Sequence, residues 1–141
     1  MRHLLALFLL VLCSAARAEW NEVEWQGDRA LYGAIRVFVD YSSIQRTGNT
    51  VTLRYLSDYA VTGNIKAYIS NRRVLFHYYS TIKTTEYTCS KSELRDLAIT
   101  YLASPMGKGT SYDSPQFYKE WREIKNEYPM GRAVAAVACN R

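Results

Sequence analysis

The segment 65–89 limits the possible folds more than any other part of the chain. Two runs of alternating apolar residues flank a polar break at Asn71-Arg72, and a third run, rich in threonine, ends at Cys89. Such alternation puts every second side chain on the same face of a β-strand. The residues expected to share a face are Ile65, Ala67 and Ile69 in the first run and Val74, Phe76 and Tyr78 in the second. We therefore expect neighbouring antiparallel strands that end on a cysteine able to bond to the last helix.

Three more segments have the pattern of short strands. Residues 20–25 alternate weakly and suit an edge strand, and residues 34–40 alternate except at Phe38. Residues 51–58 place Val51, Leu53 and Tyr55 on one face. Residues 46–49 and 62–64 combine Thr, Gly and Asn, which is typical of turns. Short strands joined by polar turns predict an antiparallel meander.

Residues 90–103 fit two structures equally well. Ser90 and Glu93 have the spacing of a helical capping box. Leu97, Ile99 and Tyr101, in contrast, alternate with smaller and more polar residues, as in a strand. The residues of this segment alone leave both structures open.

The remaining C-terminal part is expected to hold a loop and a helix. Residues 105–109 contain Pro and two Gly and predict a flexible loop, while 115–128 fit a helical turn or a short strand. Pro129 should end that element, and the alanine-rich segment 131–139 is expected to be a helix. A helix this short is marginal alone, so we expect its small side chains to pack closely on the sheet.

The first 18 residues have the features of a secretory signal. A basic start is followed by an uncharged apolar run over residues 4–12 and by small residues at positions 16 and 18. We expect cleavage between Ala18 and Glu19, which leaves one domain over residues 19–141. Lipid anchoring at Cys13 is the alternative, but Leu12 stands where lipoprotein signals have a small residue. No segment of the mature chain is long and apolar enough to cross a bilayer.

Two cysteines, Cys89 and Cys139, remain once the signal is removed. An even pair in an exported chain predicts one disulfide. The rival interpretation is a metal site, but two thiols and a single mature histidine, His77, without close spacing make a poor zinc ligand set. We expect the disulfide and assign no metal.

The sequence gives little support to nucleic-acid binding or to catalysis. The mature chain keeps 16 basic residues against 13 acidic ones, a mild excess, and Arg72-Arg73 is only a pair. His77 is better explained as a strand residue than as a general base. Asp40 and Asp58 end two expected strands, where aspartates usually cap turns. We therefore predict a protein that is not an enzyme and has no cofactor.

Several short motifs, in this order and spacing, resemble the surface-adhesin protein E-like family of exported proteobacterial proteins. They are Phe38-Val39-Asp40 with Ile44 and Arg46, Leu56-Ser-Asp-Tyr59, Tyr87-Thr-Cys89, Tyr101 with Met106-Gly-Lys-Gly109, Trp121 before Pro129, and Cys139. The resemblance implies an α+β fold: an antiparallel sheet of about six strands, crossed by a C-terminal helix that is disulfide-linked to the sheet. It also favours a strand over residues 90–103.

The resemblance further implies a binding function. The founding member is an outer-membrane lipoprotein that binds host matrix and plasma proteins and can form dimers; Leu12 departs from its lipoprotein signal. A protein partner, either a host matrix or an envelope protein, is therefore expected, with a homodimer as a further possibility. A soluble periplasmic accessory or inhibitor protein is the alternative. The candidate binding surface is Arg54, Lys66, Tyr68, Arg72, Arg73 and His77.

Overall fold

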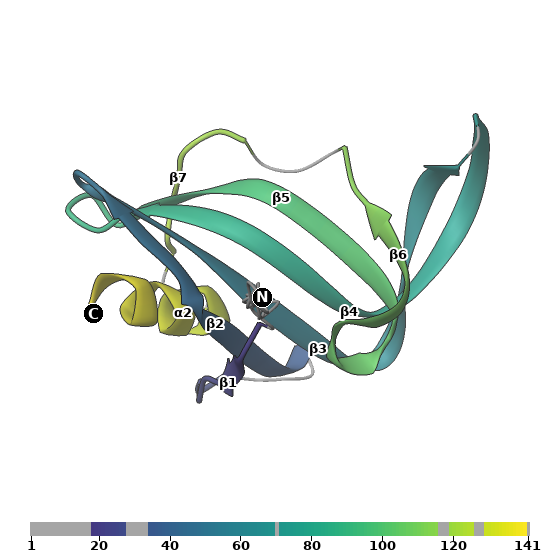
Figure 1. Ribbon diagram of the computed structural model, residues 1–141, viewed down its shortest axis with the longest axis horizontal. Coiled ribbons are helices and arrows are strands. Elements are labelled where there is room, and N and C mark those ends of the chain that lie inside the picture. Colours follow the sequence, from purple (N-terminus) through teal and green to yellow (C-terminus); the bar gives the residue numbers. More distant parts are fainter. Residues whose placement is uncertain (1–17, 28–33, 70, 116–118, 126–128, 141) are drawn as a thin grey trace, which may run out of the picture.

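The computed structural model describes residues 18–27, 34–69, 71–115, 119–125 and 129–140. In these residues the chain forms one curled antiparallel sheet with a helix at its C-terminal end (Figure 1). The sheet order is β1-β2-β3-β4-β5-β6, and β7 pairs separately with β5. The strands are β1 (Trp20–Glu22), β2 (Ala34–Thr47), β3 (Thr50–Ile69), β4 (Arg72–Thr88), β5 (Glu93–Ser104), β6 (Lys108–Asp113) and β7 (Arg122–Glu123).

The predicted meander is confirmed, because consecutive strands β1 to β6 are neighbours throughout the sheet. Gly48 and Asn49 form the turn between β2 and β3, where Thr47 pairs with Thr50. Gly48 has a φ of +57°, a conformation that glycine adopts without steric cost. The expected turn at residues 46–49 is therefore present, and the long hairpin it closes brings β2 against β3.

The turn predicted at residues 62–64 is wrong, because β3 runs without interruption from Thr50 to Ile69. The register jumps between Asp58, which pairs with Ser80, and Gly63, which pairs with Tyr78. This is a bulge, and it bends the strand instead of ending it. Gly63 is needed for close contact: a Cβ there would lie 2.2 Å from Cζ of Tyr78.

The open choice over residues 90–103 is resolved as a strand, as the family resemblance implied. Ser90 and Ser92 lie in the turn after β4, and β5 begins at Glu93, so no helix follows the apparent capping box. The loop predicted at 105–109 contains a 3-10 turn, η1 (Pro105–Gly107), and the start of β6. Of the segment 115–128, residues 122–123 form β7, while 116–118 and 126–128 lie outside the described residues.

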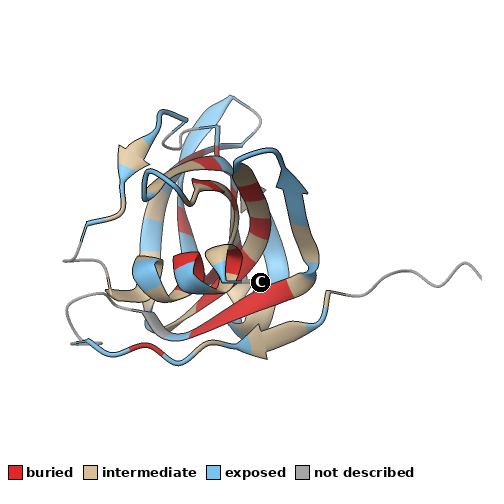
Figure 2. Cartoon of the chain, turned by 90° about the vertical axis from the view of Figure 1, so that its left-hand side faces the viewer, coloured by how far each residue is buried: buried red, intermediate tan, exposed pale blue. Residues whose placement is uncertain are grey.

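The helix α2 (Pro129–Cys139) packs across the inner face of the curled sheet (Figure 2). Pro129 is its first residue, so the helix begins two residues before the predicted 131; the end of the preceding element lies outside the described residues. Val134, Ala135 and Ala138 are buried against β2, β3 and β4, as the small side chains predicted. The buried sheet residues of this core include Val37, Val39, Val51, Leu53, Tyr55 and Tyr87.

The opposite face of the sheet has a second buried patch, which explains why Phe38 breaks the alternation of its strand. Phe38 pairs with Leu56, and both are buried. The turn η1 covers this patch: Gly107 lies over Leu56 and Ile82, where a Cβ would come within 2.9 Å of the Leu56 side chain. The Met106 N–H donates to Oδ1 of Asp58 at 2.8 Å, so Asp58 holds the turn in place.

The predicted disulfide is present between Cys89, just after β4, and Cys139, the last residue of α2. The two Cα atoms are 5.6 Å apart, within the usual range for a disulfide. Nη2 of Arg46 donates to the backbone carbonyl of Ala138 at 2.9 Å. This bond satisfies a carbonyl that the end of a helix leaves free. The C-terminal end of α2 is thus attached to both β2 and β4.

Candidate binding surfaces

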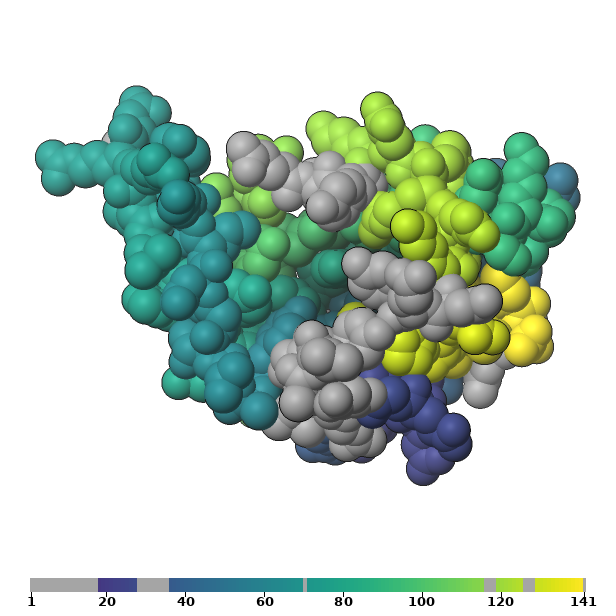
Figure 3. All heavy atoms as spheres, turned by 180° about the vertical axis from the view of Figure 1, so that it is seen from behind, coloured from purple at the N-terminus to yellow at the C-terminus, as the bar shows by residue number. Residues whose placement is uncertain are grey.

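A two-stranded ribbon projects from the body of the sheet. We define the distal ribbon as residues 63–69 of β3 and 72–78 of β4, which pair continuously from Gly63–Tyr78 to Ile69–Arg72. Figure 3 shows these teal residues standing out from the rest of the molecule. The pairing of β2 with β3 stops at Tyr59, and that of β5 with β4 stops at Ser80. Within the described segments, both ribbon edges are therefore without a neighbouring strand.

One face of the distal ribbon consists of exposed residues. Directly opposed residues in an antiparallel pair point to the same face, and the pairs here are Asn64–His77, Lys66–Leu75 and Tyr68–Arg73. All six are exposed, and we call them the outer ribbon face. On the other face, Ala67 and Phe76 are buried. The outer ribbon face thus holds four of the predicted binding residues: Lys66, Tyr68, Arg73 and His77.

The other two predicted residues lie elsewhere. Arg72 pairs with Ile69 and points to the opposite face of the ribbon. Arg54 lies in the other half of β3, where its guanidinium is 4.0 Å from a carboxylate oxygen of Asp40 and 5.8 Å from the ring centroid of Trp20. The six predicted residues therefore do not form one surface, because the bulge in β3 separates Arg54 from the ribbon.

The charged residues alone did not reveal how apolar the ribbon surface is. Of the exposed large hydrophobic residues, Tyr68, Ile69, Val74 and Leu75 are in the ribbon, and Val61 and Tyr79 lie next to it. Tyr68 is 61% exposed and Leu75 is 56% exposed. Exposed apolar side chains that cluster in this way often mark an interaction site. The sequence feature that pointed to this apolar surface was the strand alternation, because it placed apolar residues on both faces of the ribbon.

An aromatic cluster fixes the base of the ribbon to the body. The Tyr78 ring packs edge-on against Tyr59, at 5.6 Å between centroids, and against Tyr101, at 4.7 Å. Tyr112 of β6 packs against Phe76, with 5.9 Å between the ring centroids. The Tyr68 backbone N–H donates a hydrogen bond to the Tyr112 hydroxyl oxygen at 3.3 Å. Burial raises the pKa of Tyr78 and that of Tyr101 above their ordinary value. The base of the ribbon is therefore packed against the body of the sheet.

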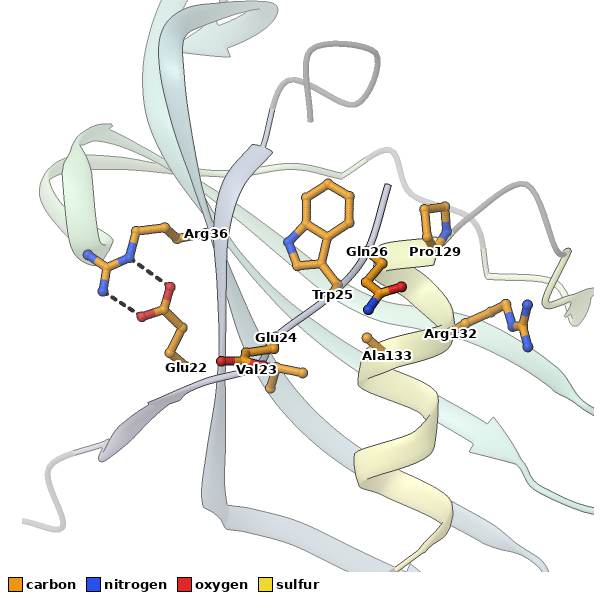
Figure 4. Close-up of a pocket in the computed structure, with 9 residues that line it drawn as sticks. All are labelled: Glu22, Val23, Glu24, Trp25, Gln26, Arg36, Pro129, Arg132 and Ala133. Carbon is orange, nitrogen blue, oxygen red and sulfur yellow. Dashed lines mark hydrogen bonds and ion pairs between the residues drawn. The ribbon is translucent and has the colours of Figure 1, made fainter. Parts of the chain in front are cut away.

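A separate groove lies where the N-terminal segment passes the start of α2. It has a volume of about 800 Å³, and its lining includes Trp25, Gln26, Pro129 and Arg132 (Figure 4). Figure 4 shows the Glu22–Arg36 ion pair at one side of this groove, with two hydrogen bonds of 2.9 and 2.7 Å. None of the predicted binding residues lines it.

The three candidate acid–base residues lie in three different environments. His77 is exposed on the outer ribbon face, whereas Asp58 binds η1. Asp40 is buried and accepts a hydrogen bond from the Ser42 N–H at 3.1 Å. In the part of the chain that the structure describes, no group of three His, Cys, Asp or Glu residues is placed to hold a metal ion. No helix of the described segments has the length and hydrophobicity that a membrane crossing requires.

A family model described as Surface-adhesin protein E matches residues 28–140, which is most of the chain. The chain belongs to the surface-adhesin protein E family. The resemblance drawn from its short motifs is thereby confirmed, and the chain is adhesin-like in family. No curated protein matches it.

Solved structures of a family member have the same fold. Crystal form II of Haemophilus influenzae protein E matches with a TM-score of 0.55 at 12% identity, over 74% of this chain and 80% of that chain. Protein E from non-typeable Haemophilus influenzae matches with a TM-score of 0.53 at 16% identity, over 86% of each chain. At these identities the likeness establishes the fold alone.

Proposed function

We propose that the chain is an exported, non-catalytic adhesin-like protein that binds a protein partner through its outer ribbon face. The observation that carries this proposal is the combination of exposed apolar and basic side chains on that face. Tyr68 and Leu75 supply apolar contact area, while Lys66 and Arg73 supply positive charge beside it. Interfaces commonly combine an aromatic and apolar centre with a polar rim.

The charge of this region selects the kind of partner. The sequence has no Asp or Glu between Asp58 and Glu86, whereas Lys66, Arg72 and Arg73 lie within the ribbon. A partner with an acidic surface and apolar side chains is therefore the best match, and charge complementarity would also increase its association rate. The ribbon edges pair with no strand of the described segments, so their main-chain groups, apart from the Tyr68 N–H that Tyr112 accepts, offer hydrogen bonds to an extended segment of that partner. A host matrix or envelope protein is the expected class.

The test is binding of the mature domain to immobilised matrix proteins and to envelope extract, compared with ribbon variants. Tyr68→Ser with Leu75→Ser should reduce capture at least tenfold, because both remove contact area from the outer ribbon face. Leu97→Ser is the matched control, since Leu97 is also exposed but lies in β5 of the body. Arg73→Gln should weaken capture and make it less dependent on salt concentration. Arg132→Gln on α2 should change neither. Ribbon variants that bind like the wild type, or a wild type that captures nothing above background, would refute the proposal.

Export is part of the same proposal. Residues 1–17 lie outside the described residues, so the signal segment and Cys13 rest on the sequence pattern alone. We expect the mature protein to begin at Glu19, which mass spectrometry of the exported protein would reveal. A mature N-terminus elsewhere, or a lipid attached at Cys13, would contradict this prediction.

The second candidate function is that of a soluble periplasmic accessory or inhibitor protein. Leu12 before Cys13 favours it, because that residue does not fit a lipoprotein signal. Protease treatment of intact cells removes a surface-displayed protein, whereas osmotic shock releases a periplasmic one.

A homodimer is also compatible with the ribbon edges, which pair with no strand of the described segments. It would be detected as a doubled mass in analytical ultracentrifugation that the Tyr68 and Leu75 variants abolish.

A further inference from the structure

A cavity of about 530 Å³ lies between the start of α2, the β7 segment and the inner face of the sheet. This volume falls within the usual range for small-ligand sites. Its apolar lining includes Leu94, Ile124 and Met130, and the phenol rings of Tyr55 and Tyr87 complete one wall. It is in the half of the sheet that lies across the β3 bulge from the distal ribbon. The cavity is therefore independent of the proposed protein-binding face.

The charged residues that line this cavity are mostly basic. They are Lys83, Arg122 and Lys125, against the single acidic residue Glu123. Arg122 is neutralised by Asp96, with Nη2 2.8 Å from Oδ2, and Thr85 also donates to this carboxylate. Lys83 and Lys125 then stand against Glu123 alone, so the described cavity wall carries one positive charge in excess.

Lys83 is the unusual group among them. It lies on β4, paired with Tyr55 of β3 and Ile99 of β5, and it is half-buried. In the described part of the chain, no carboxylate lies within the 4 Å of an ion pair with Lys83. A cation that is partly removed from water gains from a charged or hydrogen-bonded partner, because such a partner offsets the hydration it has lost. Interaction with Tyr55 and Asp96 raises the pKa of Lys83 and outweighs its burial, so it remains positively charged.

We propose that this cavity binds a small organic anion with an apolar body, such as a medium-chain carboxylate. The anionic head would contact the Lys83 ammonium, with Lys125 adding charge. The apolar body would pack on Leu94, Ile124 and Met130. Such a ligand would suit both features of the site, since it would give Lys83 the close ion pair that no described carboxylate makes and would remove apolar surface from water.

The test is calorimetric titration of the mature domain with decanoate and with decan-1-ol, which has the same chain but no charge. Decanoate should bind at least tenfold more tightly than decan-1-ol. Lys83→Met should remove most of this preference, because methionine keeps the apolar stem and loses the charge. Lys91→Met, in the exposed turn before β5, is the matched control and should bind like the wild type.

Thermal unfolding of Lys83→Met separates loss of binding from loss of fold. We expect it to stay folded, since replacing a half-buried charge by an apolar side chain is usually tolerated. If that variant fails to fold, Lys125→Met serves in its place and should weaken decanoate binding about threefold, a smaller effect because Lys125 is exposed. Equal affinity for decanoate and decan-1-ol, undiminished decanoate binding by the folded variant, or no decanoate binding by the wild type would each overturn the proposal. None of these outcomes affects the proposed ribbon function.

Discussion

The contact between Gly63 and Tyr78 gives the sharpest mutational prediction. Gly63 lies where the distal ribbon leaves the body, and a Cβ at this position would be 2.2 Å from Cζ and 2.5 Å from the hydroxyl oxygen of Tyr78. Gly63→Ala therefore cannot be accommodated unless the tyrosine ring moves. The ring is not free to move at low cost, because it packs between Tyr59 and Tyr101.

The expected magnitude follows from these contacts. Displacing the Tyr78 ring loses two edge-on aromatic contacts, worth about 1 kcal/mol each, so Gly63→Ala should cost about 2 kcal/mol. Any strain that remains after the ring moves adds to this cost. Gly48→Ala is the matched control. It has nothing within 4 Å of its added Cβ, but its φ of +57° should cost about 1 kcal/mol for conformational reasons.

The assay is urea unfolding of the variants in a double-mutant cycle with Tyr78→Ala. In the Tyr78→Ala background the cost of Gly63→Ala should largely disappear, giving a coupling free energy of about 2 kcal/mol. The cost of Gly48→Ala should be the same in both backgrounds. A coupling below about 0.5 kcal/mol between positions 63 and 78 would refute the steric explanation for this glycine.

Two further predictions concern the attachments of the C-terminal region. Replacing Cys89 and Cys139 by alanine should lower the free energy of unfolding by about 4 kcal/mol, on the chain-entropy account of a bridge between residues 50 apart. A loss below about 1 kcal/mol in urea unfolding would contradict that account. Arg122→Met should cost about 3 kcal/mol, because it leaves the carboxylate of Asp96, whose side chain is only 1% exposed, buried without its counter-charge. Adding Asp96→Asn should recover at least half of this loss, and a double variant as unstable as the single one would show that the ion pair is not the cause.

Strand alternation predicted the inner core because each of those strands buries one face. Val51, Leu53 and Tyr55 all lie in the core that α2 covers, as their spacing indicated. The small residues of α2 likewise predicted a helix packed close to the sheet, and Ala138 is fully buried there. These features depend on periodicity within a single element, which a sequence shows directly.

Features that depend on distant partners were not predictable in this way. Gly63 has the same local pattern as a turn glycine, and only the Tyr78 ring, which pairs with it across the ribbon, distinguishes a close contact from a turn. Ser90 and Glu93 fit a helix start as well as a turn, and the choice rested on family resemblance. The prediction of one binding surface failed for a similar reason. The bulge in β3 separates Arg54 from the ribbon, and the ribbon register puts Arg72 on its opposite face.

The most direct test of the central claim is a hydrogen–deuterium exchange footprint of the mature domain with and without its captured protein partner. We expect slower exchange in the distal ribbon, over residues 64–69 and 72–77, and unchanged exchange in the body of the sheet. Protection confined to the groove between Trp25 and α2, with the ribbon exchanging as fast as in the free protein, would contradict it.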